Sequence, residues 1–579
     1  MTSPSPMTSP TPSSSSAPDP EKANQNMSST LSSRHLRRLR RVAVGAAGLA
    51  LVGSALTACG AGGTATGAGT EVKGGTIVYA HEQEPPCIFG GWIQQAYISR
   101  QVLDGLVTLD QDDQVKPWLA TKWAVSPDGK TYTFTLKDGV KFTDGTPLDA
   151  AAVADNFDFW ENKGGNSTAK VSIDPYFQSA RAVDATHLEI KLSQRYTPFL
   201  TLITQGYFGI QSPTALKKQT QAENCEKPVG SGAFTVAQWK HGQEVDLKKN
   251  PNYTSWPSTA KHQGPAIVDE VRWKFVSDGV SRYASLTTGQ SNVVYDVPSV
   301  NWKDAGSKFD TIKYITPGKP VSAYLNTQKG VFTDKLVRQA FAYGADRKGA
   351  VEAGFHGVIP YEGNGAVSQA TPDYDEAAAA AYPFDQAKAN QLLDQAGWTG
   401  HDKDGYRTKD GKQLFVKFPY PAGAVFNSEG ATVLQALQEQ WKKVGFNVKL
   451  IAATQAEVFS GEYSGPDAYD ASPFYWTSPS PAILWIVWRP GTAKEPNGNN
   501  QSFYNNPELG KVINAANTAT DPTKAGELYK QAQQIVSDNA ATLPLYTQNS
   551  TYASGKDLKD FWLEKSQGEP VFSDAYFVK

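Results

Sequence analysis

The chain has 579 residues, 40% of them hydrophobic and 19% charged, and its formal net charge is −2. It is too long for one ordinary compact domain, and its composition is typical of a soluble globular protein. Because it lacks a basic surplus beyond the N-terminus, a Gly-rich phosphate loop, a Gly-x-Ser-x-Gly elbow and a His-Glu-x-x-His motif, we expect no nucleic-acid partner, no enzymatic activity, no cofactor and no resident metal.

The first 58 residues are typical of an export signal rather than of a fold. Residues 1–33 are rich in Ser, Pro and Thr, and we expect a disordered extension there. Residues 34–58 are predicted to be a signal peptide, because a cluster of arginines precedes an apolar run over 42–56 that is too short to span a bilayer. Translation could begin at Met1, Met7 or Met27, and both the general secretory and the twin-arginine export routes stay open.

The apolar run ends in Leu56-Thr57-Ala58-Cys59, which resembles the lipobox cut by the lipoprotein signal peptidase. The resemblance implies cleavage before Cys59 and lipidation of its thiol. The lipid would hold the protein on the outer face of the cytoplasmic membrane, in a periplasm or cell-wall space. The alternative is a plain secretory cleavage site that contains a cysteine. Residues 59–75 are mostly Gly, Ala and Thr and are predicted to form a flexible tether.

Two further cysteines, Cys87 and Cys225, lie in the exported part. An even number of cysteines in an oxidising compartment favours a disulfide between them. The alternative is two separate thiols, each packed as a small hydrophobic side chain.

The pattern of the exported part indicates a mixed α/β fold. In the first half we expect strands over 76–80, 131–136 and 140–142, and helices over 95–106 and from Asp149 to about Trp160. In the second half we expect helices over 335–345 and 386–396. A strand–helix–strand unit follows, in which alternating apolar residues flank a helical stripe that ends at Gly445, and this order predicts a parallel pair with a right-handed crossover.

One stretch carries a specific resemblance. Residues 117–160 contain Leu119-Ala120-x-x-Trp123, Ser126-Pro127-Asp128-Gly129-Lys130-Thr131-Tyr132-Thr133-Phe134 and Gly139-Val140-Lys141-Phe142-x-Asp144-Gly145. This run resembles the signature of the extracellular solute-binding proteins of family 5, which include oligopeptide-, dipeptide- and nickel-binding proteins. Later segments agree in the family's order, so that the resemblance covers roughly 75–579: 228–234, 332–347, 385–398 and Leu543-Pro544-Leu545-Tyr546.

The resemblance implies a two-lobed α/β fold of the periplasmic-binding-protein type, in its type II large peptide-binding class, with a hinge and a central ligand cleft. The first lobe would cover 76–315 and include an inserted subdomain at 117–210. The second lobe would cover 316–542, and 543–579 would return to the first. The chain would cross the hinge near 316–326 and 540–546, and ligand binding would close the lobes.

The implied function is that of a monomeric solute-binding lipoprotein, which captures a peptide or other small solute and hands it to the permease subunits of an ABC importer. Two alternatives stay open. The protein could present its solute to a sensor as a surface receptor, or it could bind sugars or metal chelates rather than peptides.

The segment Phe474-Tyr475-Trp476-Thr477-Ser478-Pro479 resembles a Trp-x-x-Asp segment whose carboxylate pairs with the ligand's amino terminus in peptide-binding relatives. Here the Trp is present and the acid is absent. A buried ammonium without a counter-charge is unfavourable, so another acid would have to replace it, and we name Glu84, with Glu82 as the other choice in the same loop.

The same region is rich in aromatic residues, whose faces pack on sugars, rings and cations. We name Tyr475, Trp476 and Trp485 as candidate ligand-binding residues, and the alternative is a buried aromatic cluster. His81 and His356 are the only histidines in segments that could approach a ligand, and a lone His is more often structural, so no metal ligand is predicted.

Overall fold

The computed structural model describes residues 69–579 apart from 90–95, 163–166, 175, 424 and 492–496. The expected extension, signal peptide and Cys59 lie outside these residues. The described part belongs to one compact unit. Within it, no helix combines the length and the apolar character needed to cross a membrane.

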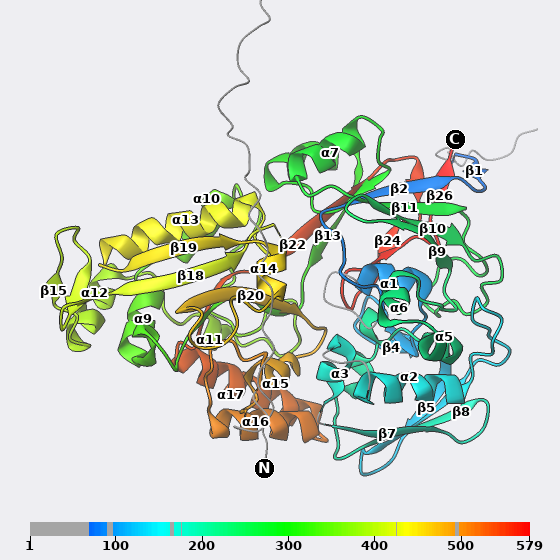
Figure 1. The fold of residues 1–579 in the computed structure, drawn as a ribbon, viewed down its shortest axis with the longest axis horizontal. Coiled ribbons are helices and arrows are strands. Elements are labelled where there is room, and N and C mark those ends of the chain that lie inside the picture. The colour runs from blue at the N-terminus through cyan, green and yellow to red at the C-terminus, as the bar shows by residue number, and fades with distance from the viewer. Residues whose placement is uncertain (1–68, 90–95, 163–166, 175, 424, 492–496) are drawn as a thin grey trace, which may run out of the picture. The chain divides into compact units, whose positions relative to one another are not determined.

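A seven-stranded mixed sheet forms the centre of the first lobe (Figure 1). β2 and β11 run parallel at its centre, and Val271 and Trp273 of β11 are fully buried. The strand β22 comes from the end of the chain and pairs with both β12 and β13. The sheet order is β13 (Asp310–Ile315), β22 (Asn549–Ser554), β12 (Val293–Val294), β2 (Thr76–His81), β11 (Glu270–Phe275), β10 (Glu244–Lys249) and β9 (Phe234–Lys240).

The inserted part of the first lobe is an antiparallel four-stranded sheet packed against α2 (Ala150–Asn162). Tyr132, Phe134 and Leu136 are buried along β6, as the alternating pattern predicts. Asp149 accepts a hydrogen bond from the backbone N–H of Ala152 at 2.9 Å and so caps α2. The strands follow the order β5 (Ala120–Val125), β6 (Thr131–Leu136), β8 (His187–Leu192) and β7 (Phe177–Ala182).

The prediction of a strand over 140–142 is wrong. Lys141 and Pro147 make only an isolated bridge. The flanking Gly139 and Gly145 adopt φ angles of 74° and 85°, and two left-handed turns so close together leave no room for a ladder.

The second lobe is built on the sheet β20 (Ala471–Thr477), β14 (Gly318–Leu325) and β21 (Thr542–Tyr546). The predicted parallel pair is present: β18 (Phe415–Pro421) pairs with β19 (Asn447–Ala453) over seven register positions, and α13 (Ser428–Lys443) connects them. The helices of this lobe are α9 (Lys335–Tyr343), α10 (Arg347–Gly354), α11 (Glu376–Ala379), α12 (Gln386–Gln395), α14 (Gln455–Phe459), α15 (Ile483–Trp488), α16 (Pro507–Thr518) and α17 (Pro522–Asp538).

Two of the predicted segment boundaries differ from those in the structure. The return to the first lobe does not begin at 543, because β21 pairs with β14 and therefore belongs to the second lobe through Tyr546. The tether does not extend to 75, because Glu71 and Val72 form β1 and pair with β26 (Tyr576–Val578). The polar and β-branched residues at 70–73 thus satisfy the backbone of the C-terminal strand.

The remaining elements complete the two lobes. They are β3 (Val107–Leu109), β4 (Val115–Pro117), β15 (Gly400–His401), β16 (Arg407–Lys409), β17 (Lys412–Gln413), β23 (Leu558–Lys559), β24 (Trp562–Leu563), β25 (Pro570–Val571), α1 (Ala96–Val102), α3 (Thr168–Ile173), α4 (Phe199–Leu202), α5 (Pro213–Lys218), α6 (Gln221–Glu226), α7 (Gly279–Thr287) and α8 (Trp302–Lys308), with 3-10 turns at Gly206–Phe208, Ser299–Asn301 and Val331–Thr333.

Candidate functional site

The two lobes meet through direct polar contacts. The chain crosses between them at 316–317 and at 547–548, where the N–H of Thr316 donates to the carbonyl of Gln548 at 3.0 Å. The Gln205 amide of the first lobe donates to the carbonyl of Thr477, at the end of β20, at 3.4 Å. The N–H of Thr197 donates to the carbonyl of Asn517 in α16 at 2.9 Å. These hydrogen bonds define the boundary between the lobes.

Tyr475 and Trp476 point to opposite faces of β20, because successive residues of a strand alternate. Tyr475 is only 6% exposed and belongs to the core of the second lobe. Burial raises the pKa of Tyr207 and Tyr295 in the first lobe, and the nearby Tyr475 hydroxyl raises it further. Tyr475 therefore reaches the boundary between the lobes.

The two candidate tryptophans lie against a different cluster. Trp476 is partly buried against the small core formed by α15, α16 and α17. Trp485 of α15 packs its ring on Tyr176 of the first lobe, with 5.8 Å between the ring centroids. Its indole nitrogen is buried and has no hydrogen-bond partner among the described residues. Trp485 therefore bridges the lobes away from Tyr475.

Glu84, which the sequence suggested as a partner for the ligand's amino terminus, is instead hydrogen-bonded to neighbouring residues. Its carboxylate accepts hydrogen bonds from the indole of Trp239 at 2.6 Å, from His241 at 2.8 Å and from the N–H of Gly242 at 2.8 Å. These donors all belong to β9 or to the turn that follows it. A carboxylate that is satisfied in this way fixes the loop and is not available to an ammonium group.

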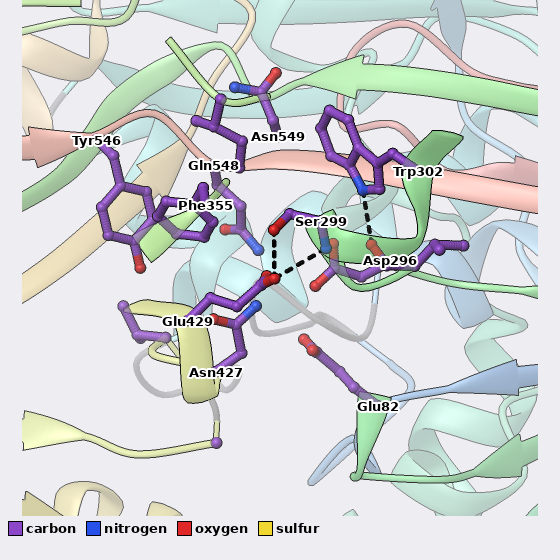
Figure 2. Close-up of a pocket in the computed structure, with 14 residues that line it drawn as sticks. Glu82, Asp296, Ser299, Trp302, Phe355, Asn427, Glu429, Tyr546, Gln548 and Asn549 are labelled. Atoms are coloured by element: carbon purple, nitrogen blue, oxygen red, sulfur yellow. Dashed lines mark hydrogen bonds between the residues drawn. The ribbon is translucent and has the colours of Figure 1, made fainter. Parts of the chain in front are cut away.

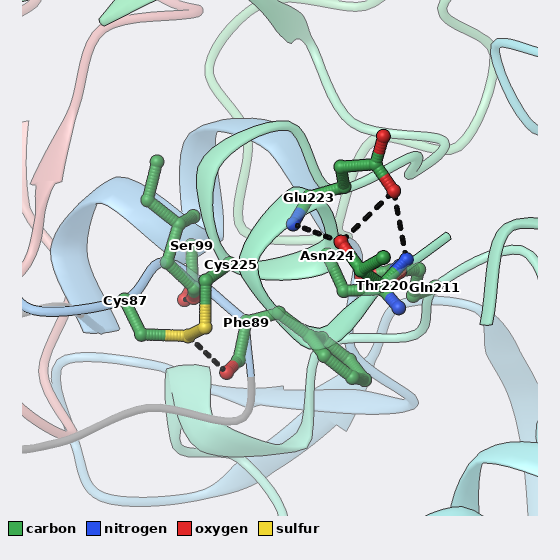
Figure 3. Close-up of a disulfide and its surroundings, with 9 residues drawn as sticks. Cys87, Phe89, Ser99, Gln211, Thr220, Glu223, Asn224 and Cys225 are labelled. Carbon is green, nitrogen blue, oxygen red and sulfur yellow. Dashed lines mark hydrogen bonds between the residues drawn. A yellow bond between two sulfur atoms is a disulfide. The ribbon is translucent and has the colours of Figure 1, made fainter.

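The disulfide Cys87–Cys225 holds the same loop from the other side (Figure 3). The Cα atoms are 4.5 Å apart, and the bond joins residues 138 positions apart. The N–H of Ile88 donates to the carbonyl of Cys225 at 3.0 Å. The loop 82–89 is thus fastened to α6 and to the β9–β10 turn, which leaves its first acid, Glu82, in a defined position.

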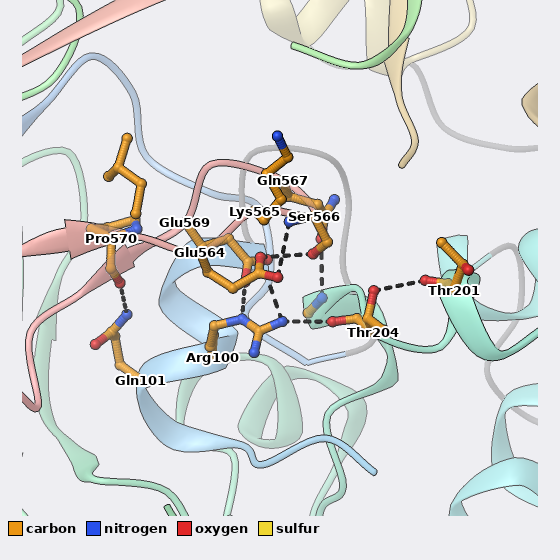
Figure 4. A network of polar contacts seen from close by, with 12 residues as sticks. Arg100, Gln101, Thr201, Thr204, Glu564, Lys565, Ser566, Gln567, Glu569 and Pro570 are labelled. Carbon is orange, nitrogen blue, oxygen red and sulfur yellow. Dashed lines mark hydrogen bonds and ion pairs between the residues drawn. The ribbon is translucent and has the colours of Figure 1, made fainter. Parts of the chain in front are cut away.

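A buried ion network joins α1 to the C-terminal segment (Figure 4). The guanidinium of Arg100 donates to the carboxylate of Glu569 and, at 2.6 Å, to the carbonyl of Thr204. The side chain of Gln567 accepts from the N–H of Gly206 at 3.0 Å. The network fixes the 3-10 turn that carries Tyr207, yet the second oxygen of Glu569 stays buried without a partner among the described residues.

Three acids from both lobes line one small cavity of about 30 Å³ (Figure 2). Glu82 follows β2, Asp296 follows β12, and Glu429 lies in the first turn of α13. Glu429 accepts hydrogen bonds from the N–H and the hydroxyl of Ser299 at 2.9 and 2.5 Å. The remaining lining residues are Val297, Trp302, Phe355, Ile359, Gly423, Val425, Asn427, Tyr546, Gln548 and Asn549.

Burial dominates the electrostatics of this cavity. It raises the pKa of Glu82 to about 8, although the charge of Arg282 opposes the shift. It raises the pKa of Asp296 to about 6, again against Arg282. The guanidinium of Arg282 donates to the backbone carbonyls of Val276 and Tyr295 at 2.7 Å each, and no carboxylate in the described part of the chain pairs with it directly.

The two histidines in segments that could approach a ligand make ordinary polar and aromatic contacts. His81 is buried and stacked on Tyr295 at 4.5 Å, and burial lowers its pKa to about 3. His356 accepts or donates at 2.8 Å to the hydroxyl of Ser299. Across the described ranges, no group of three or more His, Cys, Asp or Glu side chains is arranged to hold a metal ion.

Comparison with known proteins decides the family. The family model for bacterial extracellular solute-binding proteins, family 5 (middle), matches residues 114–495. The chain belongs to this family. The glutathione-binding protein GsiB of Salmonella typhi is 28% identical to this family 5 protein over 490 residues, which cover 83% of this chain and 89% of the relative.

Solved structures show the same fold. The oligopeptide-binding protein AppA from Bacillus subtilis, in complex with a nonapeptide, matches with a TM-score of 0.77 and 22% identity over 88% of this chain and 100% of that chain. NikA from Brucella suis, in complex with Fe(III)-EDTA, matches with a TM-score of 0.73 and 22% identity over 87% and 100%. The two-lobed α/β architecture is thus that of family 5 solute-binding proteins.

Sequence reasoning did not find Asp296 and Glu429. Both lie more than 200 residues from Glu82 and in no motif, so only the fold brings them together. One local signal existed for Asp296: its φ of 46° is in the left-handed region, which Asp adopts more readily than most residues and which is common at functional sites.

Proposed function

We propose that this family 5 protein is the solute-binding lipoprotein of an ABC importer. It captures a peptide or another small solute outside the cytoplasmic membrane by closing its lobes and delivers it to the permease. It works as a monomer tethered through lipidated Cys59 and performs no chemistry on its solute.

The observation that carries the proposal is the polar boundary between the lobes within a family that binds solutes. Hydrogen bonds such as that from Gln205 to Thr477 cross it directly. At the crossing between the lobes, the buried side-chain oxygen of Gln548 has no hydrogen-bond partner in the described part of the chain. Unpaired buried polar atoms are unfavourable, and a solute between the lobes would satisfy this one.

Peptides are the first solute class to test. GsiB proteins are glutathione-binding, and AppA was solved with a nonapeptide. NikA was solved with Fe(III)-EDTA, which keeps chelates in the test set. The aromatic residues Tyr475, Trp476 and Trp485 favour solutes with apolar or ring-shaped faces.

A thermal-shift screen of the chain from Gly60 onward tests the proposal. The test solutes are glutathione, di- to pentapeptides, oligosaccharides and metal chelates. A solute that binds only the native state raises the melting temperature with the logarithm of its concentration. We expect such a rise for at least one peptide. A rise with none of the four classes would contradict solute capture.

A further inference from the structure

A cluster of polar and aromatic side chains lies where α15 of the second lobe meets the inserted subdomain of the first (Figure 1). The N–H of Arg489 donates to the carbonyl of Trp485 at 3.1 Å, so the two side chains leave the same side of the helix end, four residues apart. Trp485 packs on Tyr176, and Tyr176 stacks on Tyr196 with 4.0 Å between the ring centroids. Burial raises the pKa of both tyrosines, and the nearby charge of Arg489 opposes the rise.

Three atoms of this cluster that can donate a hydrogen bond have no partner. They are the indole nitrogen of Trp485, the Nη1 atom of Arg489 and the hydroxyl of Tyr196, and each is buried and unpartnered in the described part of the chain. Tyr196 is fully buried. Indole and guanidinium groups only donate, so they cannot satisfy one another. Because unpaired buried donors are unfavourable, the missing partner is an acceptor.

The charge of the cluster indicates what kind of acceptor fits. Burial lowers the pKa of Arg489, and the charge of Asp174 opposes that shift from beyond ion-pair distance. No other carboxylate in the described ranges acts on the guanidinium. A buried cation without a close counter-ion is unfavourable, and one negative charge would compensate it. A doubly charged anion would instead exceed the charge of the single arginine and be repelled by Asp174.

The cluster lies between the lobes and apart from the aromatic residue closest to the acidic cavity. Tyr196 belongs to the first lobe and Arg489 to the second. Beside them, the amide of Gln194 donates to the side chain of Asn514 in α16 at 2.8 Å and joins the same two lobes. Tyr475 belongs to a different core. An acceptor held by the cluster would therefore contact both lobes without being part of a solute beside Tyr475.

We propose that this cluster binds a small monovalent anion, such as chloride, between the lobes. The guanidinium of Arg489, the indole of Trp485 and the hydroxyl of Tyr196 donate hydrogen bonds to it. The anion stabilises the contact between the lobes. Because solute binding closes the same lobes in the proposed function, the anion and the solute strengthen each other's binding. Anion binding itself goes beyond that function, since it requires no solute.

Thermal unfolding of the purified, solute-free chain tests the site. Sodium gluconate, whose anion is bulky, is replaced stepwise by sodium chloride at constant ionic strength, so that general screening does not change. We expect the melting temperature to rise with the logarithm of the chloride concentration, by about 1 °C or more. Equal melting temperatures in the two salts would overturn the site.

Variants locate the anion. Arg489→Gln and Trp485→Phe should each lose the rise with chloride. Trp485→Phe removes the indole N–H and keeps an aromatic ring, so it decides the question if Arg489→Gln does not fold. The matched control is Arg181→Gln, which alters an exposed arginine of the inserted subdomain that pairs with Glu189, and it should keep the rise. A full rise retained in Trp485→Phe and in any folded Arg489→Gln would overturn the site.

A second measurement separates a free anion from an acidic group of the solute. Titration calorimetry in the two salts, with the solute found by the screen, should show about fivefold tighter binding in chloride. Weaker binding in chloride would mean that chloride and the solute compete for Arg489, and it would overturn the free anion as the occupant. Binding of no solute in either salt would remove the proposed function, whereas the melting experiment would still decide the anion site.

Discussion

The carboxyl group of Glu82 is buried near the guanidinium of Arg282, and burial raises its pKa from 4.5 to about 8 against the effect of that charge. Because the folded-state pKa lies above the unfolded one, the folded protein retains a proton that the unfolded chain releases. The stabilisation is therefore complete below about pH 4.5 and is lost as the pH rises through 8. A solute-free protein should tolerate this residue best in acid.

We expect Glu82→Gln to raise the free energy of unfolding of the solute-free protein at pH 8 by about 1 kcal/mol, and to change it little at pH 5. Urea unfolding at the two pH values measures the difference. The matched variant Glu84→Gln should lose stability at both pH values, because it removes an acceptor of three hydrogen bonds. A clear destabilisation of Glu82→Gln at pH 8 would mean that its charge is paired after all.

At this scale the sequence was informative about single residues and not about their combination. It pointed to the loop that carries Glu82 and Glu84, but it favoured Glu84, since nothing in the sequence shows that Trp239 and His241 reach that carboxylate. The even number of cysteines after Cys59 was a stronger signal, and the structure joins Cys87 to Cys225.

Among the elements, the disulfide fastens the loop 82–89 to α6 and closes a loop of 138 residues. Linking distant positions restricts the unfolded chain, and removing a native disulfide of this kind typically costs about 2 to 5 kcal/mol. We therefore expect the double variant Cys87→Ser/Cys225→Ser to lower the free energy of unfolding within that range. Urea unfolding with and without reductant measures this loss of stability. Reductant should destabilise the wild type and leave the variant unchanged. In a separate alkylation experiment, two reactive thiols in the unreduced protein would refute the bond.

The helix α16 meets the inserted subdomain through Asn517. Its amide donates to the hydroxyl of Tyr176 at 2.9 Å and accepts from that of Tyr529 at 2.7 Å, and the side chain is fully buried. Asn517→Ala should speed solute release several-fold and destabilise the protein by about 1 to 3 kcal/mol, because it leaves two buried hydroxyls short of a partner. Stopped-flow dissociation measures the rate. The exposed Asn252→Ala is the control, and an unchanged release rate in Asn517→Ala would show that this contact does not hold the lobes.

Elements with strong periodicity were predictable from the sequence. The strand β6, the capped helix α2 and the parallel pair β18–β19 follow from apolar spacing and cap residues, which are local. The pairing of β21 with β14 and of β1 with β26 was not predictable, because each depends on a partner more than 200 residues away. A similar separation along the sequence explains why the acidic cavity could not be predicted.

For the whole molecule, family membership and the two-lobed fold could be predicted because the motifs between 117 and 160 are dense and specific. The solute could not be predicted, because residues from both ends of the chain form the boundary between the lobes. Tyr207 and Tyr475 are buried at that boundary, one from each lobe, and we therefore test both for an effect on solute binding.

The most direct measurement is titration calorimetry of the purified chain with the solute identified by the screen, followed by recovery of that solute. We predict one solute per chain, recovered unchanged. We also predict about 5- to 30-fold weaker binding in both Tyr207→Phe and Tyr475→Phe, because each removes a buried hydroxyl from one lobe. Binding that neither variant affects, or a solute returned chemically altered, would contradict capture between the lobes.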